Sequence, residues 1–168
     1  MRFSPLTEIN YVSERKCGQV RFMASVEPAC NVVCYCVDCQ SAARSLMDER
    51  GCENPLEPDG GTSFSTFLEK DWTCVAGAEH IKGHKLKEDS RTMRYIAGCC
   101  QTPLYLKYGP GFWVSTFRSA FKSEIPNLQW RLKTSHRNSS LPYPDELPRF
   151  KGFPFRLYWA LYRAKWRG

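Results

Sequence analysis

Three cysteines stand close together in the segment CYCVDC, at Cys34, Cys36 and Cys39. Thiolate sulfurs bind zinc at about 2.3 Å, and three ligands from one segment suit a metal site that keeps its fourth position open. The same pattern could instead mark a buried β-strand that carries cysteines as small apolar residues. The spacing favours the metal site, with these three residues as its ligands.

The chain contains nine cysteines in 168 residues. An odd number that includes the adjacent pair Cys99 and Cys100 does not fit the disulfide framework of a small secreted protein, because neighbouring cysteines make poor bridges. Metal binding in a reducing intracellular compartment, cytoplasmic or mitochondrial, is therefore expected. Cys30, Cys52 and Cys74 are expected to be small buried apolar residues.

Length and charge narrow the class of protein. A chain of this length predicts one ordinary domain, and no apolar run approaches the roughly 20 residues of a membrane span. The net charge is +7, and residues 149–168 hold six basic residues and no acidic one, so the rest of the chain is nearly neutral. This distribution argues against a broad nucleic-acid-binding face and for a local attachment by the tail.

Short β-prone segments separated by turn residues predict a mainly β protein of antiparallel sheets. These segments are 18–26, 29–36, 62–70, 91–97, 103–108 and 112–117. An acidic insertion at 47–61, which contains proline and glycine, is expected to form a surface loop beside the cysteine site. The polar stretch 135–148 is expected to pack as an irregular strap.

The C-terminal segment FPFRLYWALYRAKWRG has helical periodicity, and Pro154 can open the helix at its first turn. One predicted face carries Phe155, Tyr158, Trp159, Tyr162 and Trp166, and another carries Arg156, Arg163 and Arg167. Such residues suit a membrane interface or an acidic, apolar groove on a partner protein. The alternative is a terminal helix that packs on its own domain. RNA ranks behind these, because no known RNA-binding motif is present, and a nucleic-acid partner is not expected.

Several motifs occur in an order that resembles the glutathione-dependent formaldehyde-activating enzyme family, which includes centromere protein V. They are CGQVRF, CYCVDCQ, GCCQTPLY and PDELPRFKGFP. The resemblance runs from about residue 14 to about residue 154. It implies an Mss4-like (β-tent) fold of antiparallel sheets for residues 1–153, which the helical tail 154–168 follows. It also implies carbon–sulfur lyase chemistry on S-(hydroxymethyl)glutathione.

The resemblance further implies two zinc sites, of which one is open and one is structural. Cys34, Cys36 and Cys39 match all three ligands of the open site, which is proposed to meet a thiol adduct of glutathione. The structural site of the family uses four cysteines. Only Cys17 and Cys100 match here, because Arg15 and Ala97 occupy the positions of the other two ligands.

The fate of the incomplete site has three alternatives. Cys17 and Cys100 could pack as reduced thiols, they could form a disulfide, or Cys99 and Cys30 could rebuild a displaced metal site. Simple loss of this metal is the expectation. It leaves one zinc ion, at CYCVDC, as the implied cofactor.

Two functions follow. The expected one is a non-catalytic, zinc-binding accessory subunit of a larger complex, such as a membrane-associated or mitochondrial one, because ligands are lost and because an insertion and a basic aromatic tail are present. The alternative is a carbon–sulfur lyase. A glutathione pocket should offer positive groups to two carboxylates, yet Arg44 is the only basic residue soon after Cys39.

Overall fold

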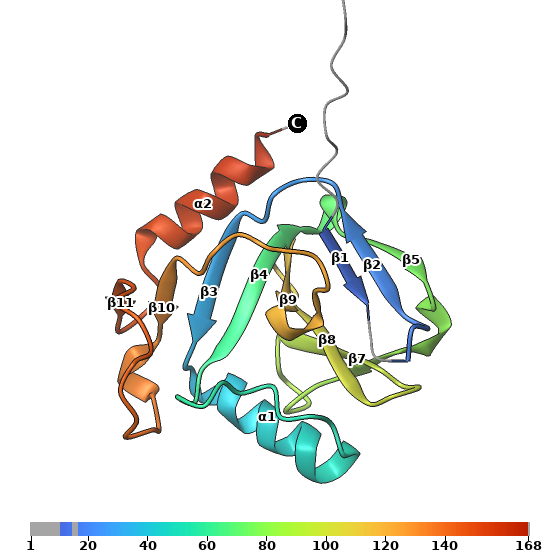
Figure 1. Ribbon diagram of the computed structural model, residues 1–168, viewed down its shortest axis with the longest axis horizontal. Helices are drawn as coiled ribbons and strands as arrows, with labels where there is room; N and C mark the ends of the chain where they lie inside the picture. The colour runs from blue at the N-terminus through green and yellow to red at the C-terminus, as the bar shows by residue number, and fades with distance from the viewer. Residues whose placement is uncertain (1–10, 15–16, 168) are drawn as a thin grey trace, which may run out of the picture.

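The structure is a computed structural model that describes residues 11–14 and 17–167, and it is mainly β (Figure 1). A mixed sheet has the strand order β11-β10-β3-β4-β9-β8-β7-β6, and a smaller antiparallel sheet has the order β1-β2-β5. The strands are β1 (Tyr11–Glu14), β2 (Arg21–Ala24), β3 (Cys30–Cys34), β4 (Thr62–Leu68), β5 (Thr73–Ala76), β6 (Ile81–His84), β7 (Thr92–Ala97), β8 (Thr102–Tyr108), β9 (Trp113–Phe117), β10 (Trp130–Leu132) and β11 (Arg149–Phe150). The α-helices are α1 (Val37–Arg50) and α2 (Phe155–Lys165).

The predicted β-segments are confirmed, since each of them coincides with most or all of a strand. The prediction of purely antiparallel sheets is wrong at one edge, where β10 runs parallel to both β3 and β11. Parallel neighbours need a long connection, because the chain must return to the end at which it started. The polar strap between β10 and β11 supplies that connection.

Strand β4 lies between two apolar clusters, and all of its residues are buried. On one side Phe67 stacks on Trp72 with ring centroids 5.0 Å apart, in a cluster that joins residues of both sheets. On the other side Phe64 lies 5.0 Å from Phe117, in a cluster that includes Leu161 of α2. The C-terminal helix therefore covers the face of the large sheet that the small sheet leaves free.

Helix α1 was not among the predicted elements, and the predicted loop 47–61 is wrong at its start, because residues 47–50 form the last turn of this helix. The segment is rich in Ala, Leu, Met, Arg and Gln, which favour helices. The helix begins at Cys36, whose Sγ accepts a hydrogen bond from the backbone N–H of Cys39 at 3.3 Å. It ends at Gly51, with φ 63°, whose N–H donates to the carbonyl oxygens of Leu46 and Met47. Cysteine is an unusual N-cap residue, which conceals the start of the helix.

Helix α2 packs on β3 and β4. Leu161 and Ala164 are buried in this contact, and Leu157 and Ala160 are partly buried beside them. The tail thus packs on its own domain, as one of the sequence alternatives proposed. It does so through its leucine and alanine side, which leaves the aromatic side free.

Candidate metal centre

The junction between β3 and α1 brings the three predicted ligands together. Cys34 is the last residue of β3, Cys36 caps α1, and Cys39 lies in the first turn of that helix. Their Sγ atoms all lie within 4.8 Å of one another. A tetrahedral zinc site with Zn–S bonds of 2.3 Å holds its sulfurs about 3.8 Å apart. The three thiols, which are soft donors, therefore fit a thiophilic metal such as zinc after small adjustments. Cys34 is buried and the other two cysteines are half-buried, and we name these residues the buried cluster.

The buried cluster shares its negative charge unequally when no metal is bound. Hydrogen bonds from the Cys34 and Cys39 thiols, helped by the positive charge of Arg94, lower the pKa of the Cys36 thiol to about 3. The hydrogen bond to Cys36 raises the pKa of Cys34 to about 12. Interaction with Cys34 also raises the pKa of Cys39. Near neutral pH, one thiolate is therefore held by two thiols.

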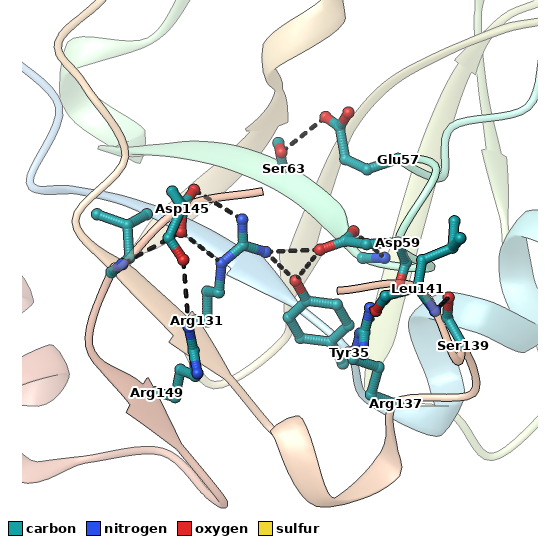
Figure 2. Close-up of polar contacts among 12 residues, drawn as sticks. Tyr35, Glu57, Asp59, Ser63, Arg131, Arg137, Ser139, Leu141, Asp145 and Arg149 are labelled. Atoms are coloured by element: carbon teal, nitrogen blue, oxygen red, sulfur yellow. Dashed lines mark hydrogen bonds and ion pairs between the residues drawn. The ribbon is translucent and has the colours of Figure 1, made fainter. Parts of the chain in front are cut away.

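A buried polar network braces Tyr35, which lies between the ligands Cys34 and Cys36 (Figure 2). The Tyr35 hydroxyl donates to Asp59 Oδ2 at 2.6 Å, and it accepts a hydrogen bond from Arg131. Arg131 Nη1 also donates to Asp59 Oδ2 at 2.8 Å. The other edge of the guanidinium donates to both carboxylate oxygens of Asp145, at 2.9 and 2.7 Å. The network ties the acidic insertion, the strap and β10 to the metal-binding segment.

A cavity of about 580 Å³ opens beside the buried cluster, and all three of its cysteines line the wall. The sheet contributes apolar side chains such as Phe64 and Leu132, and α2 contributes Leu157 and Leu161. A metal at the cluster would therefore face a partly open, mainly apolar space. This arrangement suits a metal with one position open to a small ligand.

The cavity also offers positive charge, which reasoning from neighbouring sequence missed. Arg94 of β7 and Lys133, which follows β10, both line the wall. Arg94 is 4% exposed, and its Nη2 donates to the Asp38 carbonyl oxygen at 3.3 Å. In the sequence, the one available indication of Arg94 was an arginine in the middle of the apolar strand TMRYIA. Lys133 carried no such signal, because only the fold brings it to the cavity.

A second set of three cysteines meets on the surface. Cys17 Sγ lies 3.4 Å from Cys99 Sγ and 3.5 Å from Cys100 Sγ. Cys17 and Cys99 are exposed, Cys100 is half-buried, and all three are free thiols. They lie within the distance at which three thiols could hold a metal. We name these residues the exposed cluster.

The exposed cluster bears on the alternatives for the incomplete site. The sequence predicts loss of this metal, yet Cys99 adds a third thiol to Cys17 and Cys100. Cys30 does not take part, because it is buried in β3 within another core cluster. Ala97 ends β7, is fully buried and offers no ligand atom. Arg15 lies outside the described residues.

Comparison with known proteins places the chain in a family. The model of a family of unknown function, DUF6151, matches residues 12–110, which is more than half of the chain. The chain belongs to the DUF6151 family. No curated protein matches it. A similar solved structure is that of a Rhodobacter sphaeroides protein, with 14% identity, coverage of 83% of this chain and 99% of that chain, and a TM-score of 0.49.

Both cysteine clusters of this DUF6151 protein lie inside the matched region. Arg94 lies inside it as well. Arg131 and Lys133, together with the strap and α2, lie beyond it. The cavity is thus completed by elements that follow the family region of the chain.

Proposed function

We propose that this DUF6151 protein is a zinc-thiolate protein of Mss4-like (β-tent) fold that acts on carbon–sulfur bonds of small thiol adducts, of which S-(hydroxymethyl)glutathione is the type. One observation supports this proposal more than any other. The three cysteines of the buried cluster line a cavity of about 580 Å³ that also holds Arg94 and Lys133. An accessory subunit would need neither the cavity nor its charges.

The residues of the chain have distinct roles in this proposal. Zinc, when bound by Cys34, Cys36 and Cys39, supplies a Lewis acid that holds sulfur and polarises oxygen. In the cavity, Arg94 and Lys133 attract the carboxylates of a glutathione-type ligand. The reaction is reversible addition of a thiol to an aldehyde, in which sulfur bonds to the carbonyl carbon and the thiol proton passes to the carbonyl oxygen.

The test measures turnover. Zinc-loaded protein is mixed with glutathione and ¹³C-labelled formaldehyde, and exchange between free aldehyde and adduct is followed by NMR. The wild type should accelerate the exchange and Cys36→Ser should not. Cys74→Ser is the matched control, because Cys74 lies in neither cluster and its Sγ donates to the Ala76 carbonyl oxygen, as a serine hydroxyl can. No acceleration by zinc-loaded wild type would refute the proposal.

The second candidate is the function expected from sequence, a non-catalytic, zinc-binding accessory subunit of a larger, membrane-associated complex in a reducing compartment such as the cytoplasm or the mitochondrion. The aromatic residues of α2 favour it, because they are exposed and available for contact. Purification from the native source separates the two candidates. An accessory subunit should elute with a fixed set of partner subunits and show no turnover, whereas the enzyme should turn over alone.

A further inference from the structure

Helix α2 has two opposite apolar faces. At 100° per residue, the side that packs on the sheet holds Leu157, Ala160, Leu161 and Ala164. The opposite side holds five aromatic residues within an arc of about 100°. These are Phe155, Tyr158, Trp159, Tyr162 and Trp166, which are 80%, 51%, 57%, 51% and 73% exposed. Figure 1 shows α2 on the outside of the fold, and the exposed fractions of the five rings show that the stripe is open to solvent.

Basic residues flank the aromatic stripe. Arg156, Arg163 and Arg167 follow one edge and Lys165 the other. Two of them rest on rings of the domain, because the Arg156 guanidinium lies 5.3 Å from the Phe150 centroid and the Lys165 ammonium lies 4.9 Å from the Phe112 centroid. No acidic residue occurs between 149 and 168. The whole face is therefore aromatic at its centre and positive at its margins.

We propose that this face of α2 docks on the surface of an anionic membrane. Tryptophan and tyrosine favour the boundary between lipid headgroups and acyl chains, and flanking arginine and lysine side chains reach anionic headgroups. A helix held by its opposite face lies flat on such a surface, as interfacial helices do. In the part of the chain that the structure describes, none of the helices has the length and apolar character of a membrane span.

The charge of the face excludes a second copy of the chain as its occupant, because a symmetric contact would bring the basic margins of two helices together. An anionic lipid surface complements that charge. Tyr158 belongs to the aromatic stripe and also lines the cavity, so docking places one wall of the cavity at the membrane. The inference does not depend on the chemistry of the cysteine clusters.

The test is sedimentation of the full chain with vesicles of phosphatidylcholine alone and with vesicles that also contain phosphatidylserine. We expect at least about tenfold tighter binding to the anionic vesicles, weakened by salt. The double variant Trp159→Ala, Trp166→Ala should lose at least about tenfold in that binding. Both tryptophans are exposed, so unfolding curves should match those of the wild type. Leu141→Ala, a similarly exposed apolar residue on the strap, is the control and should bind normally.

Two results would overturn the proposal. One is a wild-type chain that remains in the supernatant with both kinds of vesicle, which would instead favour an acidic groove on a partner protein. The other is vesicle binding that survives the double tryptophan variant unchanged. The proposal also fails on a third result: Arg163→Gln with Arg167→Gln should remove most of the preference for anionic lipid, and retention of the full preference would contradict the proposed contact with anionic headgroups.

Discussion

The two cysteine clusters use the same donor atoms in different surroundings. The buried cluster lies where a strand meets a helix, beside a polar network on one side and a cavity on the other. The exposed cluster joins the turn 98–101 to Cys17, and two of its three thiols face solvent. Both sets of thiols converge closely enough to hold a metal, whereas their surroundings would decide whether a bound metal faces the cavity or bulk water.

Removal of Arg131, whose network braces Tyr35 beside the buried cluster, should have the largest effect on stability. Its side chain is 2% exposed and pairs with Asp59 and Asp145. Arg131→Met leaves the buried Asp59 carboxylate and the Tyr35 hydroxyl without this partner, so the free energy of unfolding in urea should fall by about 3–5 kcal/mol. Arg149→Met breaks an exposed ion pair and should cost less than about 1 kcal/mol. Equal losses in the two variants would show that the network does not brace the fold.

Serine substitutions should separate the clusters by function. In cobalt-substituted protein, a thiol ligand that enters the cavity changes the visible absorption of the metal. Cys36→Ser should weaken this response to glutathione at least about 100-fold, since losing even an outer partner of a metal ligand costs 10–100-fold. Cys99→Ser, in the exposed cluster, should leave it unchanged. Loss of the response in Cys99→Ser, with the response retained in Cys36→Ser, would show that the exposed cluster holds the metal that meets the ligand.

Metal affinity of the buried cluster should rise with pH. The pKa of Cys34 is raised to about 12 and that of Cys39 is also raised, whereas that of Cys36 is lowered to about 3. Near neutral pH, metal binding therefore releases two protons, so the affinity should fall by up to about 100-fold for each unit decrease in pH. Zinc titration of Cys99→Ser against a chelating dye between about pH 6 and 8 measures this slope. A flat profile would contradict the assigned protonation.

Substitution of two glutamines, one beside each cluster, should give the smallest changes in stability. Gln40 of α1 is buried, and its side-chain amide donates to the carbonyl oxygens of Tyr35 and His136 at 2.7 and 2.8 Å. Gln40→Ala should lower the free energy of unfolding by about 1–3 kcal/mol, because two carbonyl groups lose a partner. Gln101, beside the exposed cluster, donates to the Gly98 carbonyl oxygen at 2.9 Å. Gln101→Ala should cost about 1 kcal/mol or less, and a larger loss there than at Gln40 would reverse the comparison.

Local sequence predicted what depends on local spacing. Alternation located the principal strands, and Cys-x-Cys-x-x-Cys identified three thiols that the β3–α1 junction brings together. Helix α1 was not predicted from the sequence, because its N-cap residue is a cysteine, which is unusual at that position. The sequence did not predict the roles of Arg94, Lys133 and Arg131, because these roles depend on partners far away in the chain. Cys99 was only an alternative, because a pattern that favours Cys100 cannot show which way the adjacent thiol points.

The amount of zinc per chain, measured by elemental mass spectrometry on natively purified protein, decides whether the buried cluster is a metal centre. The wild type and Cys36→Ser should be purified side by side, with Cys74→Ser as the control. We expect the wild type and the control to carry the same amount of zinc and Cys36→Ser to carry one zinc fewer. A wild type without zinc, or a Cys36→Ser variant with undiminished zinc, would contradict the assignment of the buried cluster as the metal centre.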